Sequence, residues 1–183
     1  MGEFAVGQSV PREEDPRLLT GGGEYLDDVN LRDQAWGYVL RSPHGLAHIR
    51  SIDTTMAQEA PGVLAVLTGA DWAAEGYGSL PCEDLAKTRS DGSPIFHPHY
   101  PALVPDTARY VGDYVAFVVA ETRSQARDAA EMIEVDYEPV PAVPTIESAL
   151  ADGATAIWPV CSDNVSFFEE KGDKAAVDQA FAK

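Results

Sequence analysis

The sequence has few cysteines, few basic residues and no long apolar run, and each shortage excludes a class of protein. The only cysteines, Cys82 and Cys161, have no second Cys or His at ligand spacing, so neither a disulfide scaffold nor a zinc site is supported. Lys and Arg number 13 against 30 Asp and Glu, and this net charge of -17 excludes a surface for phosphate backbones. No apolar run reaches the ~18 residues of a membrane helix, and residues 1–4 do not resemble a signal peptide. We therefore expect a cytoplasmic protein that binds neither nucleic acid nor membrane.

The composition is that of a folded domain, with 45% hydrophobic and 9% aromatic residues. Its acidic residues are spread along the chain, which favours a solvated surface over a docking patch for a basic partner. At the N-terminus, two prolines within residues 11–16 and the glycines at 21–23 interrupt any periodicity. Residues 1–34 are therefore predicted to form an extended arm that lies on another surface.

Two strand–helix–strand units are predicted in the middle of the chain. The first has alternating strands at 35–40 and 47–52, a short helix after Thr54, and a buried strand at 63–67. The second begins with a strand at 114–120 that is apolar on both faces. A helix follows, with a capping box at Thr122 and Gln125, and then a strand from residue 134 with one wet face. These units predict an α+β core over residues 35–145 with one mixed sheet.

Two parts of the chain have weak periodicity. Residues 76–105 hold five prolines and three glycines, so we expect a long loop that is either functional or mobile. Residues 146–183 have a short helix near 146–150, no clear element over 153–168, and a second helix at 173–181. We interpret 146–183 as a linker.

The candidate catalytic patterns are all incomplete. His97 and His99 have a spacing that can chelate a metal ion, but no third ligand is identifiable and a surface turn explains them equally well. Ser42 has no nucleophile-elbow glycines around it. The sequence therefore predicts no catalytic, cofactor-binding or metal-binding residue, which favours a structural or assembly role.

Several short strings nevertheless occur together in a specific order. The sequence resembles the N-terminal a/b hammerhead region of the molybdenum-binding large subunit of the xanthine dehydrogenase, aldehyde oxidase and carbon monoxide dehydrogenase family. The resemblance covers residues 7 to about 181 and rests on the strings at 11–21, 25–28, 41–44, 60–63, 67–71, 109–112 and 128–131.

This resemblance implies a molybdenum hydroxylase, which takes oxygen from water and passes electrons from molybdopterin through [2Fe-2S] clusters, usually to FAD. In the family, the cofactor motifs, the substrate pocket and the base glutamate lie downstream of the hammerhead. The resemblance therefore implies that this chain alone is an inactive scaffold. Its partners would be the molybdopterin-binding domains and the iron–sulfur and FAD subunits, with 146–183 leading toward the first of those domains. The alternative is a stand-alone, non-catalytic binding or assembly module.

The sequence departs from the family pattern at two places, and two of its turns are candidates for a domain interface. Gly45-Leu46 stands where Ala-His is usual, and Asp113-Tyr114 stands where Glu-Pro is common, so the strand at 114 is free to begin earlier. Turns beside well-formed strands are common contact sites. We expect two turns to pack at a domain interface, and their residues are Arg41, Ser42, Pro43, His44, Tyr110, Val111 and Gly112.

Overall fold

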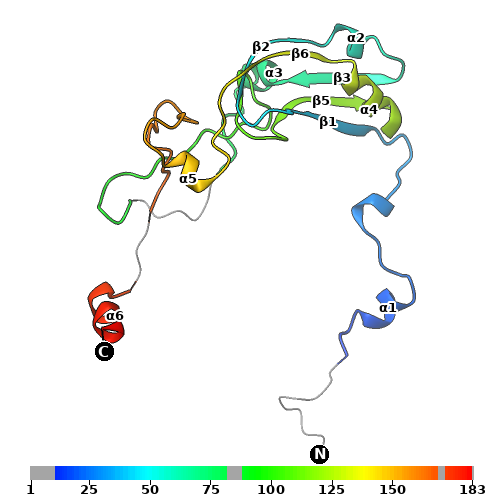
Figure 1. Ribbon diagram of the computed structural model, residues 1–183. Helices are drawn as coiled ribbons and strands as arrows, with labels where there is room; N and C mark the ends of the chain where they lie inside the picture. Colours follow the sequence, from blue (N-terminus) through cyan, green and yellow to red (C-terminus); the bar gives the residue numbers. More distant parts are fainter. Residues whose placement is uncertain (1–10, 82–87, 169–171, 183) are drawn as a thin grey trace, which may run out of the picture. The chain divides into compact units, whose positions relative to one another are not determined.

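A computed structural model describes residues 11–81, 88–168 and 172–182 of the chain (Figure 1). Its internal contacts divide the chain into two compact units, Met1–Gln34 and Ala35–Lys183. Cys82 lies outside the described residues.

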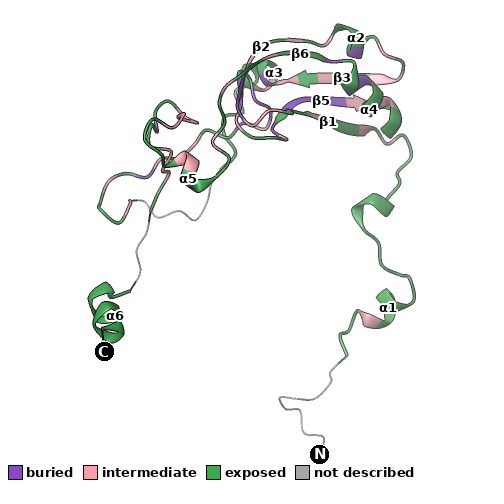
Figure 2. Cartoon of the chain, in the orientation of Figure 1, coloured by how far each residue is buried: buried purple, intermediate pink, exposed green. Residues whose placement is uncertain are grey.

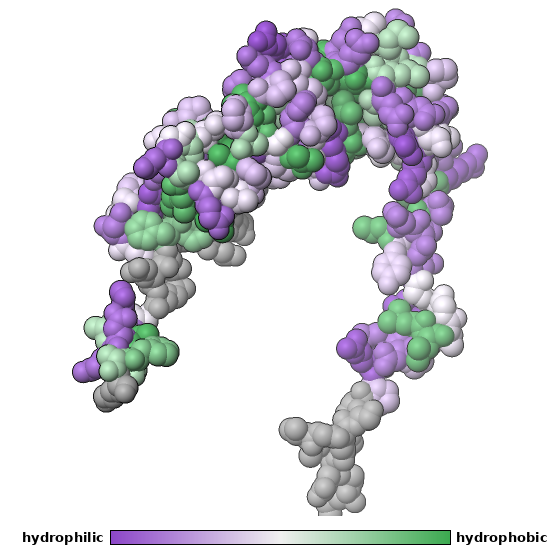
Figure 3. Space-filling model, in the orientation of Figure 1, coloured by the Kyte–Doolittle hydropathy of each residue, from purple (hydrophilic) through white to green (hydrophobic). Residues whose placement is uncertain are grey.

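The first unit contains two helical turns where the sequence predicts only extended chain. Helix α1 spans Asp15–Leu19, and a 3-10 helix, η1, spans Leu26–Asp28. Proline is tolerated in α1 because it stands in the first turn, where its missing N–H has no helical partner. Hydrophobic residues reach the surface around α1, shown in green in Figure 3, and Leu19 is 85% exposed.

The strands of the second unit form two three-stranded sheets, and every strand pairing among the described residues is antiparallel. The first sheet has the order β1 (Trp36–Arg41), β5 (Tyr114–Ala120), β3 (Val63–Thr68). The second has the order β4 (Thr107–Ala108), β2 (Ala47–Asp53), β6 (Glu134–Pro139). The prediction of one mixed sheet is therefore wrong.

The reason is that each predicted unit crosses from one sheet to the other. The units themselves are present, as β2–α2–β3 with α2 at Thr55–Gln58 and as β5–α4–β6 with α4 at Arg123–Glu131. Both sides of β5 are occupied by β1 and β3, so β6 pairs with β2 instead. Local periodicity identifies strands but not their partners.

The core lies where α4 and α2 pack on one face of the β1–β5–β3 sheet. The predicted helical stripe Ala126, Ala129, Ala130 and Ile133 is buried, and their short side chains let α4 approach Ala116 and Val118 of β5. The Thr122 hydroxyl accepts the backbone N–H of Gln125 at 3.2 Å, which is the N-cap half of the predicted capping box, while the Gln125 side chain accepts the Thr122 hydroxyl at 2.8 Å. Figure 2 shows buried residues, in purple, along β5.

Among the described helices of the second unit, one was not predicted from the sequence. Helix α3, Gly69–Ala74, follows β3 directly and begins with a capping box in which the Asp71 carboxylate accepts the Thr68 N–H at 2.7 Å. A β-carbon on Gly69 would overlap the backbone carbonyl of Val104, so this close approach requires glycine. The two predicted C-terminal helices are present as α5, Ile146–Ala149, and α6, Lys174–Phe181.

Candidate functional site

The two turns expected at an interface lie next to each other. The end of β1 and the start of β5 lie side by side at one end of their sheet, where Arg41 pairs with Tyr114. The backbone N–H of Ser42 donates to the carbonyl of Asp113 at 2.8 Å, and the N–H of Gly112 donates to the carbonyl of Ser42 at 2.8 Å. Antiparallel pairing thus joins 41–44 and 110–113 into one feature, named here the paired turns.

The first turn is held together by the Ser42 hydroxyl. Ser42 is 2% exposed, and its Oγ donates to the His44 carbonyl at 3.2 Å and accepts the His44 N–H at 3.1 Å. The His44 ring lies edge-on to Tyr137, with centroids 4.9 Å apart, and burial raises the pKa of the Tyr137 phenol. Pro43 is exposed. The Ser42 hydroxyl thus has a structural role in holding this turn.

The second turn presents apolar surface above a network of polar contacts. Arg41 donates from Nη1 to the Gly112 carbonyl at 3.2 Å, and its guanidinium lies 4.4 Å from the Tyr114 ring centroid. The hydroxyls of Tyr110 and Tyr100 are 2.7 Å apart, and burial, followed by this hydrogen bond, raises the pKa of Tyr110. Val111 is 69% exposed at the tip.

Asp113 anchors the second turn, a role that sequence reasoning missed. Asp113 is 4% exposed. Its two carboxylate oxygens accept the backbone N–H groups of Arg109 at 2.9 Å and Tyr114 at 3.0 Å. β5 begins at Tyr114 and not earlier, and the N–H that the missing proline leaves free donates to the Asp113 carboxylate. The Gly112-Asp113 pair at the strand entry was the available signal, since Asp commonly bonds to nearby backbone N–H groups.

A second feature brings together the two segments for which the sequence predicts no regular element. Phe96 and Ser166 exchange two hydrogen bonds, from the Phe96 N–H at 2.9 Å and from the Ser166 hydroxyl at 2.6 Å. Arg89 forms an ion pair with Asp163 at 3.5 Å and donates to the Val165 carbonyl. The long loop is thus partly ordered by residues 157–168.

Asn164 organises this region from a left-handed backbone conformation, with φ of 56°. Its Oδ1 accepts the Ile157 N–H at 2.9 Å, and its Nδ2 donates to the carbonyls of Ala149 at 3.1 Å and Thr155 at 3.0 Å. One amide side chain therefore ties three points of the chain together.

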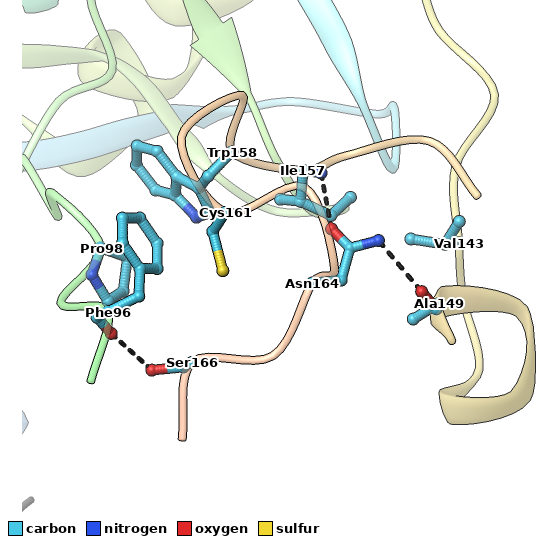
Figure 4. Close-up of a pocket in the computed structure, with 9 residues that line it drawn as sticks. All are labelled: Phe96, Pro98, Val143, Ala149, Ile157, Trp158, Cys161, Asn164 and Ser166. Atoms are coloured by element: carbon cyan, nitrogen blue, oxygen red, sulfur yellow. Dashed lines mark hydrogen bonds between the residues drawn. The ribbon is translucent and has the colours of Figure 1, made fainter. Parts of the chain in front are cut away.

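Beside Asn164 lies a cavity of about 280 Å³ (Figure 4). The amide of Asn164 and the hydroxyl of Ser166 are used in the bonds above, so the wall that remains is mainly apolar. Burial, followed by the nearby Asp163 carboxylate, raises the pKa of the Cys161 thiol, which makes it a poor nucleophile. The lining residues are Phe96, Pro98, Val143, Ala149, Ile157, Trp158, Cys161, Asn164 and Ser166.

Within residues 11–81, 88–168 and 172–182, no group of three His, Cys, Asp or Glu side chains could hold a metal ion. His48 contacts Thr107, and His97 and His99 are exposed. In the same part of the chain, no helix has the length and apolarity needed to cross a membrane.

Comparisons with known proteins agree with this architecture. Residues 20–141 match the family model described as aldehyde oxidase and xanthine dehydrogenase, a/b hammerhead domain. The chain is 39% identical over 152 residues to the nicotine 6-hydroxylase large subunit of Paenarthrobacter nicotinovorans, covering 82% of this chain and 18% of that protein. It is 35% identical over 192 residues to the carbon monoxide dehydrogenase large chain of Afipia carboxidovorans, covering 97% and 22%.

A solved structure gives the same result in three dimensions. The aldehyde oxidoreductase of Desulfovibrio desulfuricans aligns with a TM-score of 0.75 at 28% identity, over 93% of this chain and 19% of that one. The chain thus spans about a fifth of the length of the relatives it matches. The matched domain, which contains the paired turns and both sheets, shows that the chain belongs to the aldehyde oxidase and xanthine dehydrogenase family, as its a/b hammerhead domain.

Proposed function

We propose that this chain is a scaffold domain in the large subunit of a molybdenum hydroxylase that oxidises a small substrate with oxygen from water. The observation that carries the proposal is the match to the carbon monoxide dehydrogenase large chain, which includes 97% of this chain but only 22% of that protein. Most of such a subunit therefore lies outside the matched part, and we assign the chemistry to it.

The residues of this chain do not fit the molybdopterin cofactor that the family implies. The cofactor carries anionic phosphate, whereas this chain has a net charge of -17. The cavity beside Asn164 is mainly apolar, and the polar side chains of Asn164 and Ser166 in its wall are already bonded within the protein. We assign molybdopterin binding to other domains of the subunit, and the [2Fe-2S] clusters and FAD to partner subunits or domains.

The paired turns are the proposed contact with those domains. Their backbone is fixed by reciprocal hydrogen bonds between Ser42, Gly112 and Asp113, so little conformational entropy is lost when they bind. Val111 and Tyr110 are 69% and 39% exposed on this rigid support. Residues 146–183 are the proposed connection toward the molybdopterin-binding domain, and Phe181 of α6 is 88% exposed.

A chimeric enzyme tests the proposal. This chain would replace the matched segment of the Afipia carboxidovorans carbon monoxide dehydrogenase large chain. We expect the chimera to assemble with molybdenum and to retain activity, and the large chain without the segment to lose both. Val111→Asp should impair assembly of the chimera, whereas Val160→Asp, at a residue 83% exposed elsewhere, should not.

Measurements on the isolated chain separate the scaffold from the other possibilities. We expect neither stoichiometric molybdenum nor hydroxylase turnover from it, and finding either would overturn the proposal. If the chimera fails to assemble although the isolated chain is folded, a stand-alone binding or assembly module becomes the better explanation.

A further inference from the structure

The β1–β5–β3 sheet has a second face that is apolar but only partly covered. Residues paired across antiparallel strands share a face, so Val39, Phe117 and Leu67 form one row, and Gly37, Val119 and Ala65 form the next. Both rows lie opposite the face that carries Val118 and α4. An antiparallel sheet with one face in water normally alternates apolar and polar residues, and these rows do not.

The exposure of these residues shows that the face is open at one end. Val115, on the same face of β5, is fully buried, and the adjoining Leu103 is 7% exposed. By contrast, Leu67 is 43% exposed, and Val39, Phe117 and Val119 are half-buried. The Phe117 ring lies so close over Gly37 that a β-carbon on Gly37 would overlap the ring.

A groove of about 350 Å³ continues this face beyond Leu67. Its walls include Trp72 of α3 and Tyr77, whose ring centroids are 5.0 Å apart. The Trp72 indole donates to the Gly78 carbonyl at 3.0 Å, so the ring is fixed in place. Shallow aromatic grooves with fixed walls suit the anchor side chain of a bound segment.

The charge at this groove selects the kind of partner. The six described residues that line it include two acids, Asp71 and Glu75, and no base. Hydrogen bonds from the Thr68 hydroxyl and N–H lower the pKa of Asp71, so its carboxylate is ionised at neutral pH. A second copy of this chain would bring the same acids and a further charge of -17 to the contact, which opposes self-association.

We propose that the apolar rows and the adjoining groove form a docking surface for a polypeptide segment with an aliphatic or aromatic anchor flanked by Lys or Arg. The anchor enters the groove between Leu67 and Trp72. The basic flanks lie near Asp71 and Glu75. This surface is distinct from the paired turns, whose residues line neither the rows nor the groove.

Binding of two dye-labelled synthetic peptides to the 183-residue chain tests this surface. Both peptides share one core of Leu and Phe, and one has lysine flanks where the other has glutamate. By fluorescence anisotropy at physiological ionic strength, the lysine-flanked peptide should bind about tenfold more tightly. Leu67→Ser should weaken it by about tenfold, whereas Met132→Ser, at a residue 44% exposed on α4's C-terminal side, should not.

A charge variant gives a second readout that does not depend on the apolar wall. Glu75→Lys should reduce the preference for lysine flanks by about threefold, and more at low salt, whereas Glu59→Lys should leave it unchanged.

Absence of saturable binding, equal affinity for both peptides, or equal loss in Leu67→Ser and Met132→Ser would overturn the proposal. So would a dimer, detected by sedimentation, that Leu67→Ser dissociates, or binding to neutral lipid vesicles through Leu67 without peptide binding. The result is independent of the chimera, because holoenzyme assembly tests the proposed function and peptide affinity tests only this surface.

Discussion

The carboxylate of Asp113 lies 2.9 Å from the backbone nitrogen of Arg109 and accepts its hydrogen bond from a position that is 4% exposed. The same side chain accepts the Tyr114 N–H with its other oxygen. Asp113 thus closes the turn that faces Ser42 and sets where β5 begins.

Replacing Asp113 by Ala should destabilise the fold strongly. Two backbone N–H groups would lose their acceptor inside the protein, and we expect the free energy of unfolding to fall by about 3 kcal/mol. Urea denaturation would measure this loss, and the slope of the unfolding free energy against urea concentration should stay unchanged. Asp128→Ala, at an exposed position on α4, should change stability by less than about 0.5 kcal/mol, and a similar effect of the two substitutions would refute this role.

Asn164 should control the local stability of the region around the cavity. Asn164→Ala removes three hydrogen bonds and places alanine at a positive φ, whereas Asn164→Gly removes the bonds but accepts the backbone conformation. We expect the free energy of unfolding to fall by about 3 kcal/mol in Asn164→Ala. The fall should be smaller by about 1 kcal/mol in Asn164→Gly, because glycine accepts the positive φ. Hydrogen exchange at the Ile157 amide should accelerate in both variants while β5 stays protected, and uniform acceleration would contradict a local role.

The helix cap at Asp71 should make part of the stability depend on pH. Hydrogen bonds from Thr68 lower the folded-state pKa of Asp71 from its ordinary value of 3.8. Its contribution is therefore fully present above pH 3.8 and is lost as the pH falls through the lower folded-state pKa. The stability difference between the wild type and Asp71→Asn should be constant from pH 5 to 8 and shrink below about pH 4. A difference that grew on acidification would have the wrong sign.

The stacked pair of Arg109 and Trp158 should depend on the planar guanidinium. The Arg109 guanidinium lies 3.7 Å from the ring centroid of Trp158, and burial lowers the pKa of Arg109. Arg109→Lys keeps the charge but loses the flat contact, so we expect a loss of about 1 kcal/mol in thermal or urea unfolding. Arg123→Lys, at an exposed position, is the matched control and should be neutral.

Much of the local structure could be predicted from the sequence because it depends on neighbours along the chain. The alternation at 47–52 and the apolar run at 114–120 correspond to β2 and β5, and Thr122 caps α4 as expected. Helix α3 was not predicted, although the capping pair of Thr68 and Asp71 at its start was an available signal. In α1, proline suggested a break, but its place in the first turn permits a helix.

The candidate site was only partly predictable. The sequence singled out both turns of the proposed interface because they lie beside well-formed strands, and antiparallel pairing of β1 with β5 brings them together. The Gly112-Asp113 pair offered a local signal for the Asp113 anchor. Nothing in the local sequence identified Asn164, because its bonds to Ile157, Thr155 and Ala149 depend on how this region folds. Asn164 bonds to Ala149, and Phe96 bonds to Ser166 across 70 residues.

The sequence alone determined where most of the strands and helices form, that the chain is strongly acidic, and that it resembles the hammerhead of this family, since these depend on residue type and short spacing. Only the tertiary structure decided that the strands divide into two antiparallel sheets. Strand pairing depends on which edges of β5 are already occupied by β1 and β3, and short-range periodicity carries no information about that. The open apolar face beside Leu67 belongs to the same category, because both faces of β5 are apolar in sequence and packing alone leaves one of them partly exposed.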